Sequence, residues 1–359
     1  MPRRRELIDP VNKQPPIGVI LAQIGTPSQP SAKAVRPYLR RFLSDRRIID
    51  YSPLLWQPLL RGIILRTRPR RSAELYRQIW GVDGSPLLTH SLAQQARLQQ
   101  LLGNRYQVEL GLAYSEPGME QAVLKLEKSG ITRIIIVPLF PQYSSTTTAS
   151  MYDAAAFAAL GRRSARGPAS KRFVPALRFM EAYYDAPGYI TAMKNHLHRL
   201  LEEMEDKPDY YVLTFHGIPK RYAGTGDPYP EQCKETARLL AEAMGWEPGE
   251  WQLAFQSRFG REEWVGPATA AVLGELAGRG IRRPAIFSPG LVTDCLETLH
   301  ELAIEGRELF VAGGGQEENF TAFPCLNSEE DWLSFLAHQV EQNALGWITH
   351  TSRPSADHL

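Results

Sequence analysis

Cysteine is scarce in this sequence, and its apolar runs are short. Cys233, Cys295 and Cys325 are the three cysteines among 359 residues. Three widely spaced cysteines, an odd number, indicate neither a fold stabilised by disulfides nor a CxxC metal site. A protein of this composition is best suited to the reducing cytoplasm. No stretch reaches the roughly 18 apolar residues of a membrane span. The arginines near the N-terminus have no apolar segment behind them, so we expect no signal peptide.

The sequence also lacks an excess of charge of one sign. Lysine and arginine total 41, aspartate and glutamate total 39, and the formal net charge is +2. A nucleic-acid-binding protein is expected to carry a strongly basic surface, so we expect no nucleic-acid partner. Hydrophobic residues make up 43% of the chain. That share, over this length, is enough for two α/β domains with separate cores.

Short apolar runs alternate with longer segments of helical period. The strand-like runs span residues 18–24, 106–114, 133–140, 210–215, 251–255 and 284–290. The amphipathic stretches between and after them include residues 91–102, 119–130, 189–206, 230–245, 268–280 and 329–343. Strands that are apolar throughout and separated by helices indicate parallel sheets buried on both faces. The pattern predicts two similar doubly wound α/β domains of about four strands each.

A polar stretch at residues 161–172 interrupts this alternation and marks a domain boundary. The expected divisions are an N-terminal extension, two domains, a C-terminal helix and a flexible tail, at residues 1–16, 17–170, 171–327, 328–345 and 346–359. Ligands of parallel α/β sheets bind beyond the carboxyl ends of the strands, and two such sheets create a cleft between them. Functional residues are therefore expected just after the apolar runs.

One candidate is His216, which follows the apolar run 210–215 and precedes Gly217. Glycine lets the backbone turn sharply here, so the histidine is expected to point into the cleft. Imidazole binds divalent metals and takes up protons near neutral pH. The alternative is a structural histidine in the core, bonded to a backbone carbonyl.

A second candidate is a set of carboxylates after the run 284–290. Glu297, Glu301 and Glu305 are four residues apart, and Asp294 lies one turn earlier. On a helix this spacing lines the carboxylates along one face. Carboxylate oxygens suit a hard divalent cation. The alternative is an ordinary solvated helix face.

Two further segments have polar or apolar character that suits a ligand. Residues 51–65 are largely apolar, and arginines lie within and after them at positions 61, 66, 68, 70, 71 and 77. Apolar surface beside guanidinium groups suits a flat apolar ligand with carboxylate edges, or a membrane surface. A basic surface helix is the alternative. The hydroxyl-rich run 144–148 is either an anion site at a helix start or a capped loop.

Six motifs in register resemble the ferrochelatases, particularly those of Gram-negative bacteria. They are GTP (25–27), GSPL (84–87), PLFPQYSSTTTAS (138–150), LTFHGIP (213–219), FQSRFGREEWVGP (255–267) and TDCLETLHEL (293–302). Their order and spacing match the family from about residue 17 to residue 340. The resemblance implies an enzyme that inserts Fe²⁺ into protoporphyrin IX, releases two protons and forms protoheme, the terminal step of heme biosynthesis.

The resemblance also implies a fold and a set of site residues. The fold is two similar Rossmann-like domains, each a parallel four-stranded sheet flanked by helices, with porphyrin in the cleft between them. His216 and Glu297 match the family's catalytic and metal-handling pair, and Asp294, Glu301 and Glu305 match its acidic path. The porphyrin-binding positions that it implies are Ile24, Arg68, Tyr114, Tyr143, Ser144 and Trp264.

Some residues depart from the family pattern. Gln23 replaces the usual asparagine before the GTP motif, and Cys295 replaces a frequent histidine. The animal-type enzymes hold an iron–sulfur cluster with a cysteine in the hydroxyl-rich loop and others near the C-terminus. Here the loop position is Ser145, and no cysteine follows Cys325. We therefore expect no iron–sulfur cluster and no other permanently bound cofactor.

Other functions and partners stay open at this stage. The alternatives are a coproporphyrin ferrochelatase and a non-catalytic protein that binds a tetrapyrrole or heme. The expected partners are protoporphyrin IX and Fe²⁺ as substrates and heme as product. The chain is expected to be a monomer or homodimer in the cytoplasm, with a peripheral contact of residues 51–65 on the inner membrane.

Overall fold

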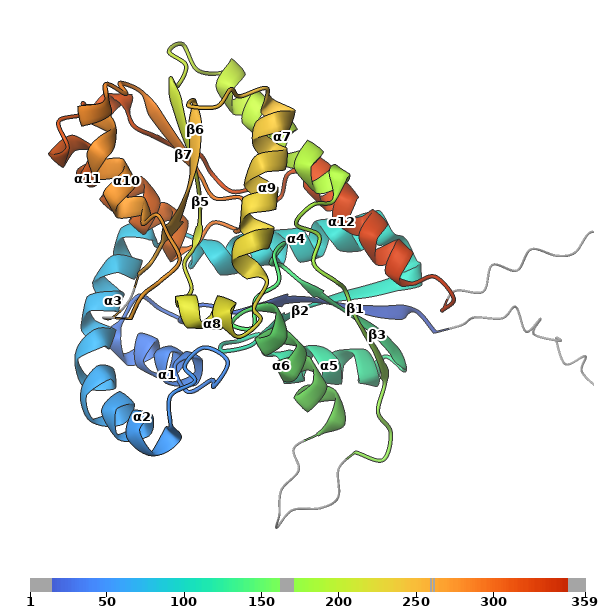
Figure 1. Cartoon of the computed structure of the whole chain (residues 1–359). Helices are drawn as coiled ribbons and strands as arrows, with labels where there is room; N and C mark the ends of the chain where they lie inside the picture. Colours follow the sequence, from blue (N-terminus) through green and yellow to red (C-terminus); the bar gives the residue numbers. More distant parts are fainter. Residues whose placement is uncertain (1–14, 162–170, 259, 261, 348–359) are drawn as a thin grey trace, which may run out of the picture.

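The computed structural model describes residues 15–161, 171–258, 260 and 262–347. It contains two parallel sheets with strand orders β2-β1-β3-β4 and β6-β5-β7-β8 (Figure 1). The strands are β1 Ile17–Gln23, β2 Tyr106–Leu112, β3 Arg133–Pro138, β4 Ala176–Phe179, β5 Tyr210–His216, β6 Trp251–Gln256, β7 Pro284–Phe287 and β8 Thr321–Ala322. The second sheet repeats the strand order of the first, which confirms the predicted pair of similar Rossmann-like domains.

Helices cover both faces of each sheet (Figure 1). They are α1 Ala32–Phe42, α2 Pro53–Leu59, α3 Leu65–Ile79, α4 Pro86–Leu102, α5 Met119–Lys128, α6 Thr148–Leu160, α7 Pro187–Glu202, α8 Lys220–Gly224, α9 Tyr229–Met244, α10 Thr269–Leu276, α11 Gly306–Ala312 and α12 Glu330–Asn343. Two segments have π-helical bonding, η1 Leu60–Ile64 and η4 Glu297–Glu305. Single-turn 3₁₀ segments are η2 Gly103–Arg105, η3 Ala277–Arg279 and η5 Glu317–Asn319.

Local sequence signals explain where several helices begin and end. Helices α2, α4, α7 and α9 carry a proline in the first turn, where its missing N–H costs no hydrogen bond. Helix α9 ends at Gly245, whose φ of +71° is left-handed, a conformation that glycine adopts without steric penalty.

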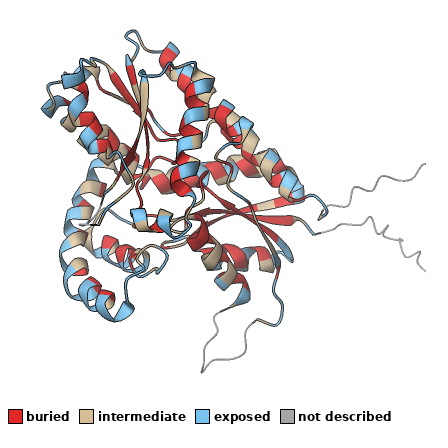
Figure 2. Cartoon of the chain, viewed as in Figure 1, coloured by how far each residue is buried: buried red, intermediate tan, exposed pale blue. Residues whose placement is uncertain are grey.

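The central strands are buried on both faces, as Figure 2 shows for the two sheets. Every residue of β1 is buried, and in β3 only Arg133 is exposed. Strands with helices on both faces have no solvent-facing side, which is why these runs are apolar throughout instead of alternating. The predicted strand runs were recognisable for this reason.

Two short edge strands depart from the predicted pattern. Strand β4 pairs with β3 in the first sheet, with Arg133 opposite Ala176 and Ile136 opposite Phe179. The first sheet therefore extends beyond residue 170, and the predicted end of the first domain is too early. Strand β4 lies at the sheet edge and is only half-buried, so it lacks the apolar run by which the inner strands were identified. Strand β8, with two residues, was missed for the same reason.

Helix α12 packs against α4 of the first domain and α7 of the second. Trp332, Leu333, Leu336 and Val340 form its buried face. The predicted C-terminal helix thus contacts both domains. Most of the expected N-terminal extension and flexible tail lies outside the described residues.

A partly buried polar contact also joins the two domains. Asp227, between α8 and α9, accepts hydrogen bonds from the hydroxyls of Ser144 and Ser145, at 3.0 and 2.7 Å, and from the Ser145 backbone N–H at 2.7 Å. These serines belong to the hydroxyl-rich run 144–148. A carboxylate of the second domain therefore occupies the position where the sequence left an anion site open.

We expect Asp227→Ala to lower the free energy of unfolding by about 1–3 kcal/mol, because it removes the carboxylate that accepts three hydrogen bonds from Ser144 and Ser145 of the other domain. Urea denaturation followed by fluorescence measures the change. Asp206 is the matched control, since its side chain is 81% exposed and its replacement by alanine should alter stability by less than about 0.5 kcal/mol. Equal stability of the two variants would contradict the role assigned to Asp227.

Candidate functional site

His216 is the last residue of β5, and the chain turns directly after it at Gly217. A Cβ atom at Gly217 would lie 2.9 Å from the carbonyl oxygen of Gln256 and 3.1 Å from the ring of Trp264. Only glycine permits this close approach. His216 is half-buried and pairs in register with Gln256 of β6. The imidazole thus stands at the carboxyl edge of the second sheet, as the sequence predicted.

Glu297 is the first residue of η4, which follows β7 through the loop 288–296. It lines a small cavity between the two domains, of about 10 Å³. Residues of both domains form the walls: Ile24, Gly25, Thr26, Tyr38, Tyr76, Ser85 and Leu87 from the first, and Cys295, Leu296 and Glu297 from the second. The structure therefore brings Ile24 and Glu297, both named from the sequence, to one cavity. π-Helical segments are rare in proteins, and those that occur are often found at functional sites.

Hydroxyl groups of the first domain surround this cavity. The hydroxyls of Thr26 and Ser85 are 2.7 Å apart, and the Tyr38 hydroxyl donates to the carbonyl of Gly25 at 3.1 Å. Burial raises the pKa of Tyr38 and of Tyr76, and the nearby Glu297 carboxylate raises the pKa of both phenols further. Sequence reasoning missed these groups, although the GTP and GSPL motifs contain two of them.

Glu301 lies one turn after Glu297 and is held by Ser257. The backbone N–H of Ser257 donates to Oε1 of Glu301 at 2.6 Å, and the Ser257 hydroxyl donates to Oε2. Ser257 has a φ of +65°, an uncommon conformation for a residue other than glycine and one that clusters at functional sites. Sequence patterns do not reveal backbone strain of this kind.

The pKa of Glu301 reports which charges surround it. Burial raises this pKa, the hydrogen bond from Ser257 and the charge of His216 lower it, and the Glu297 carboxylate raises it. Ser257 directly follows Gln256, which pairs with His216, so the hydrogen bonds from Ser257 hold Glu301 at the same sheet edge as His216. Glu297 precedes Glu301 by one turn of η4.

Glu305 ends η4 and is half-exposed, and its Oε1 lies 3.5 Å from Nδ1 of His300. Of the three glutamates, Glu297 at the start of η4 thus lines the interdomain cavity and Glu305 at its end is half-exposed. Asp294 is different. Both of its carboxylate oxygens accept hydrogen bonds inside the protein, from Thr298, Asn327 and the backbone N–H of Cys325.

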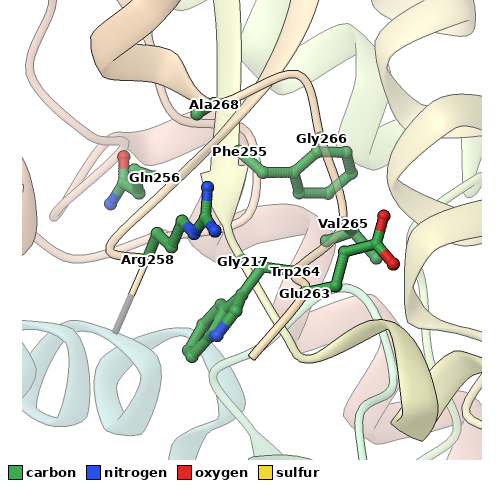
Figure 3. A pocket seen from close by; sticks show the side chains of 9 residues that line it. All are labelled: Gly217, Phe255, Gln256, Arg258, Glu263, Trp264, Val265, Gly266 and Ala268. Carbon is green, nitrogen blue, oxygen red and sulfur yellow. The ribbon is translucent and has the colours of Figure 1, made fainter. Parts of the chain in front are cut away.

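A second cavity, of about 200 Å³, lies next to His216. Its walls are formed by Gly217, Phe255, Gln256, Arg258, Glu263, Trp264, Val265, Gly266 and Ala268 (Figure 3). The indole N–H of Trp264 is buried without a hydrogen-bond partner in the structure. Trp264, named from the sequence, thus lies against Gly217, the residue after the candidate histidine. Both cavities are smaller than the roughly 300–1,000 Å³ of ordinary ligand pockets, so a tetrapyrrole occupying either one would have to enlarge it.

The remaining porphyrin positions named from the sequence line neither cavity. The Tyr114 hydroxyl donates to Asp45 at 2.6 Å, and the raised pKa of Tyr114 results from burial and this carboxylate. Ser144 is engaged by Asp227, and the backbone N–H of Tyr143 donates to Gln232.

Arg68, on α3, is partly buried, and burial lowers its pKa. Among the residues that the structure describes, no group of three or more His, Cys, Asp or Glu side chains is arranged to hold a metal ion.

The fold is similar to that of solved chelatase structures. SirB from Bacillus subtilis, solved with Fe³⁺, aligns with a TM-score of 0.53 and 14% identity over 92% of this chain and 96% of its own. The sirohydrochlorin chelatase SirB from Bacillus subtilis subspecies spizizenii, in complex with cobalt, aligns with a TM-score of 0.50 and 15% identity. It covers 74% of this chain and 92% of its own. These similarities support the fold.

Sequence relatives are closer. Ferrochelatase 1 of Shewanella oneidensis is 42% identical over 93% of this chain and 98% of its own length. The ferrochelatase of Brucella canis is 43% identical over 94% of each chain. The Ferrochelatase family model matches residues 16–344. These matches cover both sheets, both cavities and α12. They show that the chain belongs to the ferrochelatase family.

Proposed function

We propose that this protein inserts Fe²⁺ into protoporphyrin IX, forming protoheme and releasing two protons. The observation that carries the proposal is the placement of His216 and Glu301 at the carboxyl edge of the second sheet, with Glu297 one turn earlier in the wall of a cavity that the first domain also lines. A base, a set of carboxylates and an interdomain location together suit the exchange of protons for a divalent metal.

The physical difficulty of the reaction is the flat ring. In a planar porphyrin the pyrrole N–H groups lie in the ring plane, so a hydrated ion approaches slowly. Buckling the ring tilts nitrogen lone pairs toward one face and N–H groups toward the other. An enzyme that binds the buckled ring better than the flat ring accelerates insertion, and contacts remote from the nitrogens can supply the strain.

His216 and Glu297 then share two tasks, the removal of pyrrole protons and the delivery of Fe²⁺. An imidazole at the end of β5 can accept pyrrole protons or hold Fe²⁺ before insertion. Glu297, with Glu301 and the half-exposed Glu305 behind it, supplies a carboxylate route between the ring and solvent. The 10 Å³ cavity beside Glu297 is of the size of one water molecule, which suits this traffic and not the ring itself.

The test is an anaerobic assay with Fe²⁺ and protoporphyrin IX, in which heme absorbance should appear with the wild-type protein. His216→Ala should lower the rate by a factor of about 10² or more, the usual contribution of a positioned acid–base group. His198→Ala is the matched control because His198 is exposed on α7, and its rate should stay at the wild-type level.

An unchanged rate in His216→Ala would show that His216 does not act in the reaction. Failure of the wild-type protein to form heme, with tight binding of protoporphyrin or heme retained, would favour the non-catalytic alternative.

The raised pKa of Glu301 predicts a pH dependence. The Ser257 hydroxyl donates to the carboxylate and favours its charged form, so Ser257→Ala should raise the pKa of Glu301 further. If the reaction needs the Glu301 carboxylate, the acidic limb of kcat/KM against pH moves to higher pH. Glu301→Gln removes this ionisation and should lower the rate at all pH values. A pH profile of Ser257→Ala that overlays the wild type would contradict the assignment.

Residues 51–65 form an exposed apolar patch beside exposed arginines. Leu54 is 87% exposed, Leu55 is 76% exposed and Ile63 is 60% exposed. The exposed arginines around them are Arg61, Arg66, Arg70 and Arg71. Apolar side chains flanked by cations favour the surface of an anionic bilayer. In the part of the chain that the structure describes, no helix has the length and apolarity to cross a membrane. We therefore propose a peripheral contact through this patch.

Flotation with phosphatidylglycerol-containing vesicles tests the contact. Wild-type protein should float with these vesicles and much less with neutral phosphatidylcholine vesicles, and 0.5 M salt should weaken binding because it screens the arginines. The double substitution Leu54→Ser and Leu55→Ser should abolish flotation. Phe157→Ser is the control, since Phe157 is a 65% exposed apolar residue on α6, outside the patch. Equal loss in this control would contradict a specific patch.

A further inference from the structure

A buried glutamine of the first domain is bonded to the loop of the second domain that leads to Glu297. Gln94 lies on α4 and is 0% exposed. Its side-chain amide donates to the carbonyl oxygen of Asn327 at 2.8 Å and to the hydroxyl of Thr293 at 3.1 Å. The Thr293 hydroxyl is also 3.4 Å from Gln94 Oε1. An amide serves as both donor and acceptor here, which an apolar side chain cannot do.

The side chain of Asn327 is in turn hydrogen-bonded to Asp294. Its Nδ2 donates to Oδ2 of Asp294 at 2.7 Å, and its Oδ1 accepts the Asp294 backbone N–H at 2.9 Å. Asn327 has a φ of +44°, a left-handed conformation that asparagine tolerates better than most residues. The residue type therefore suits both the backbone and the paired hydrogen bonds at this position.

Asp294 in turn holds the start of η4. Its Oδ1 accepts a hydrogen bond from the Thr298 hydroxyl at 2.9 Å, and that hydroxyl accepts the backbone N–H of Cys295 at 3.0 Å. Glu297 lies between Cys295 and Thr298 in the chain. Its backbone is thus fixed on both sides by bonds that lead back to Asp294.

The network has the properties of a rigid support. Gln94, Thr293, Asp294 and Thr298 are all buried. Buried polar groups whose hydrogen bonds are satisfied rigidify their surroundings, whereas an unsatisfied member is costly. Gln94 is the member that belongs to the opposite domain, so the network couples the position of η4 to the wall formed by α4.

We propose that Gln94 is a positioning residue for the reaction: through Asn327 and Asp294 it fixes Glu297 at the wall of the interdomain cavity. The inference rests on the proposed function. It gives Asp294, which the family resemblance placed on the acidic path, the task of anchoring η4.

Gln94→Met keeps the length of the side chain and removes its hydrogen bonds. We expect kcat for heme formation to fall at least tenfold, measured well below the unfolding temperature of each protein. Gln95→Met is the matched control. Gln95 is the next residue of α4, and its amide donates to the carbonyl of Val108 within the first domain, at 2.9 Å. Its kcat should stay within twofold of wild type. A folded Gln94→Met protein with kcat within twofold of wild type would overturn the proposal.

A double-mutant cycle separates positioning from a general loss of structure. If Gln94 acts through Glu297, then Gln94→Met should change the residual rate of Glu297→Gln less than twofold, because residues that act as a unit are not additive. An equal fall in both backgrounds would mean that Gln94 does not act through Glu297. Should Gln94→Met fail to fold, Asn327→Gly takes its place, since glycine accepts the left-handed φ and removes the link to Asp294.

Hydrogen exchange provides a readout that does not depend on activity. Amides of residues 292–299 should exchange faster in Gln94→Met than in wild type, and Gln95→Met should leave them unchanged. Unchanged exchange in Gln94→Met would show that Gln94 does not hold residues 292–299 in place. If the wild-type protein formed no heme, the proposed function would fail, and this comparison would still decide whether Gln94 holds the segment.

Discussion

The site depends on a constraint of parallel sheets, whose strands all bring their carboxyl ends to the same edge. In the second sheet, β5 ends at His216, β6 ends at Gln256, and β7 leads to the loop that precedes Glu297. His216 and Glu297, 81 positions apart in the chain, therefore both follow strands that end at this edge. The first domain supplies the opposite wall, because the segment after β1 reaches the Glu297 cavity.

Much of this was predictable from the sequence because burial leaves a pattern. Inner strands such as β1 and β3 have no polar side, so their apolar runs are visible, and the residues that follow them could be named as candidates. The edge strands β4 and β8 are short and partly exposed, so they leave no such pattern. The predicted end of the first domain at residue 170 came from the polar stretch 161–172, and β4, which lies beyond it, gave no signal to correct that position.

Side-chain contacts were less predictable than positions. Asp294 and Glu297 look alike in the sequence, three residues apart, yet one is enclosed by donors and the other lines a cavity. The hydroxyl-rich run 144–148 was compatible with an external anion, whereas the partner of Ser144 is a carboxylate 83 residues further along the chain. Such differences depend on which distant groups arrive at the same place, and no local pattern encodes that. The left-handed backbone conformations of Ser257 and Asn327 likewise could not be predicted from a local sequence pattern.

The placement of α12 has a consequence for how the protein is made. This helix follows the last strand of both sheets in the chain, yet its apolar face packs against α4 and α7 and carries the fully buried Trp332. Because α12 is synthesised after every strand, a nascent chain can form both sheets while the apolar surface that α12 covers is still exposed. Exposed apolar surface of this kind promotes aggregation. The two domains are therefore fully packed together only once α12 has been made.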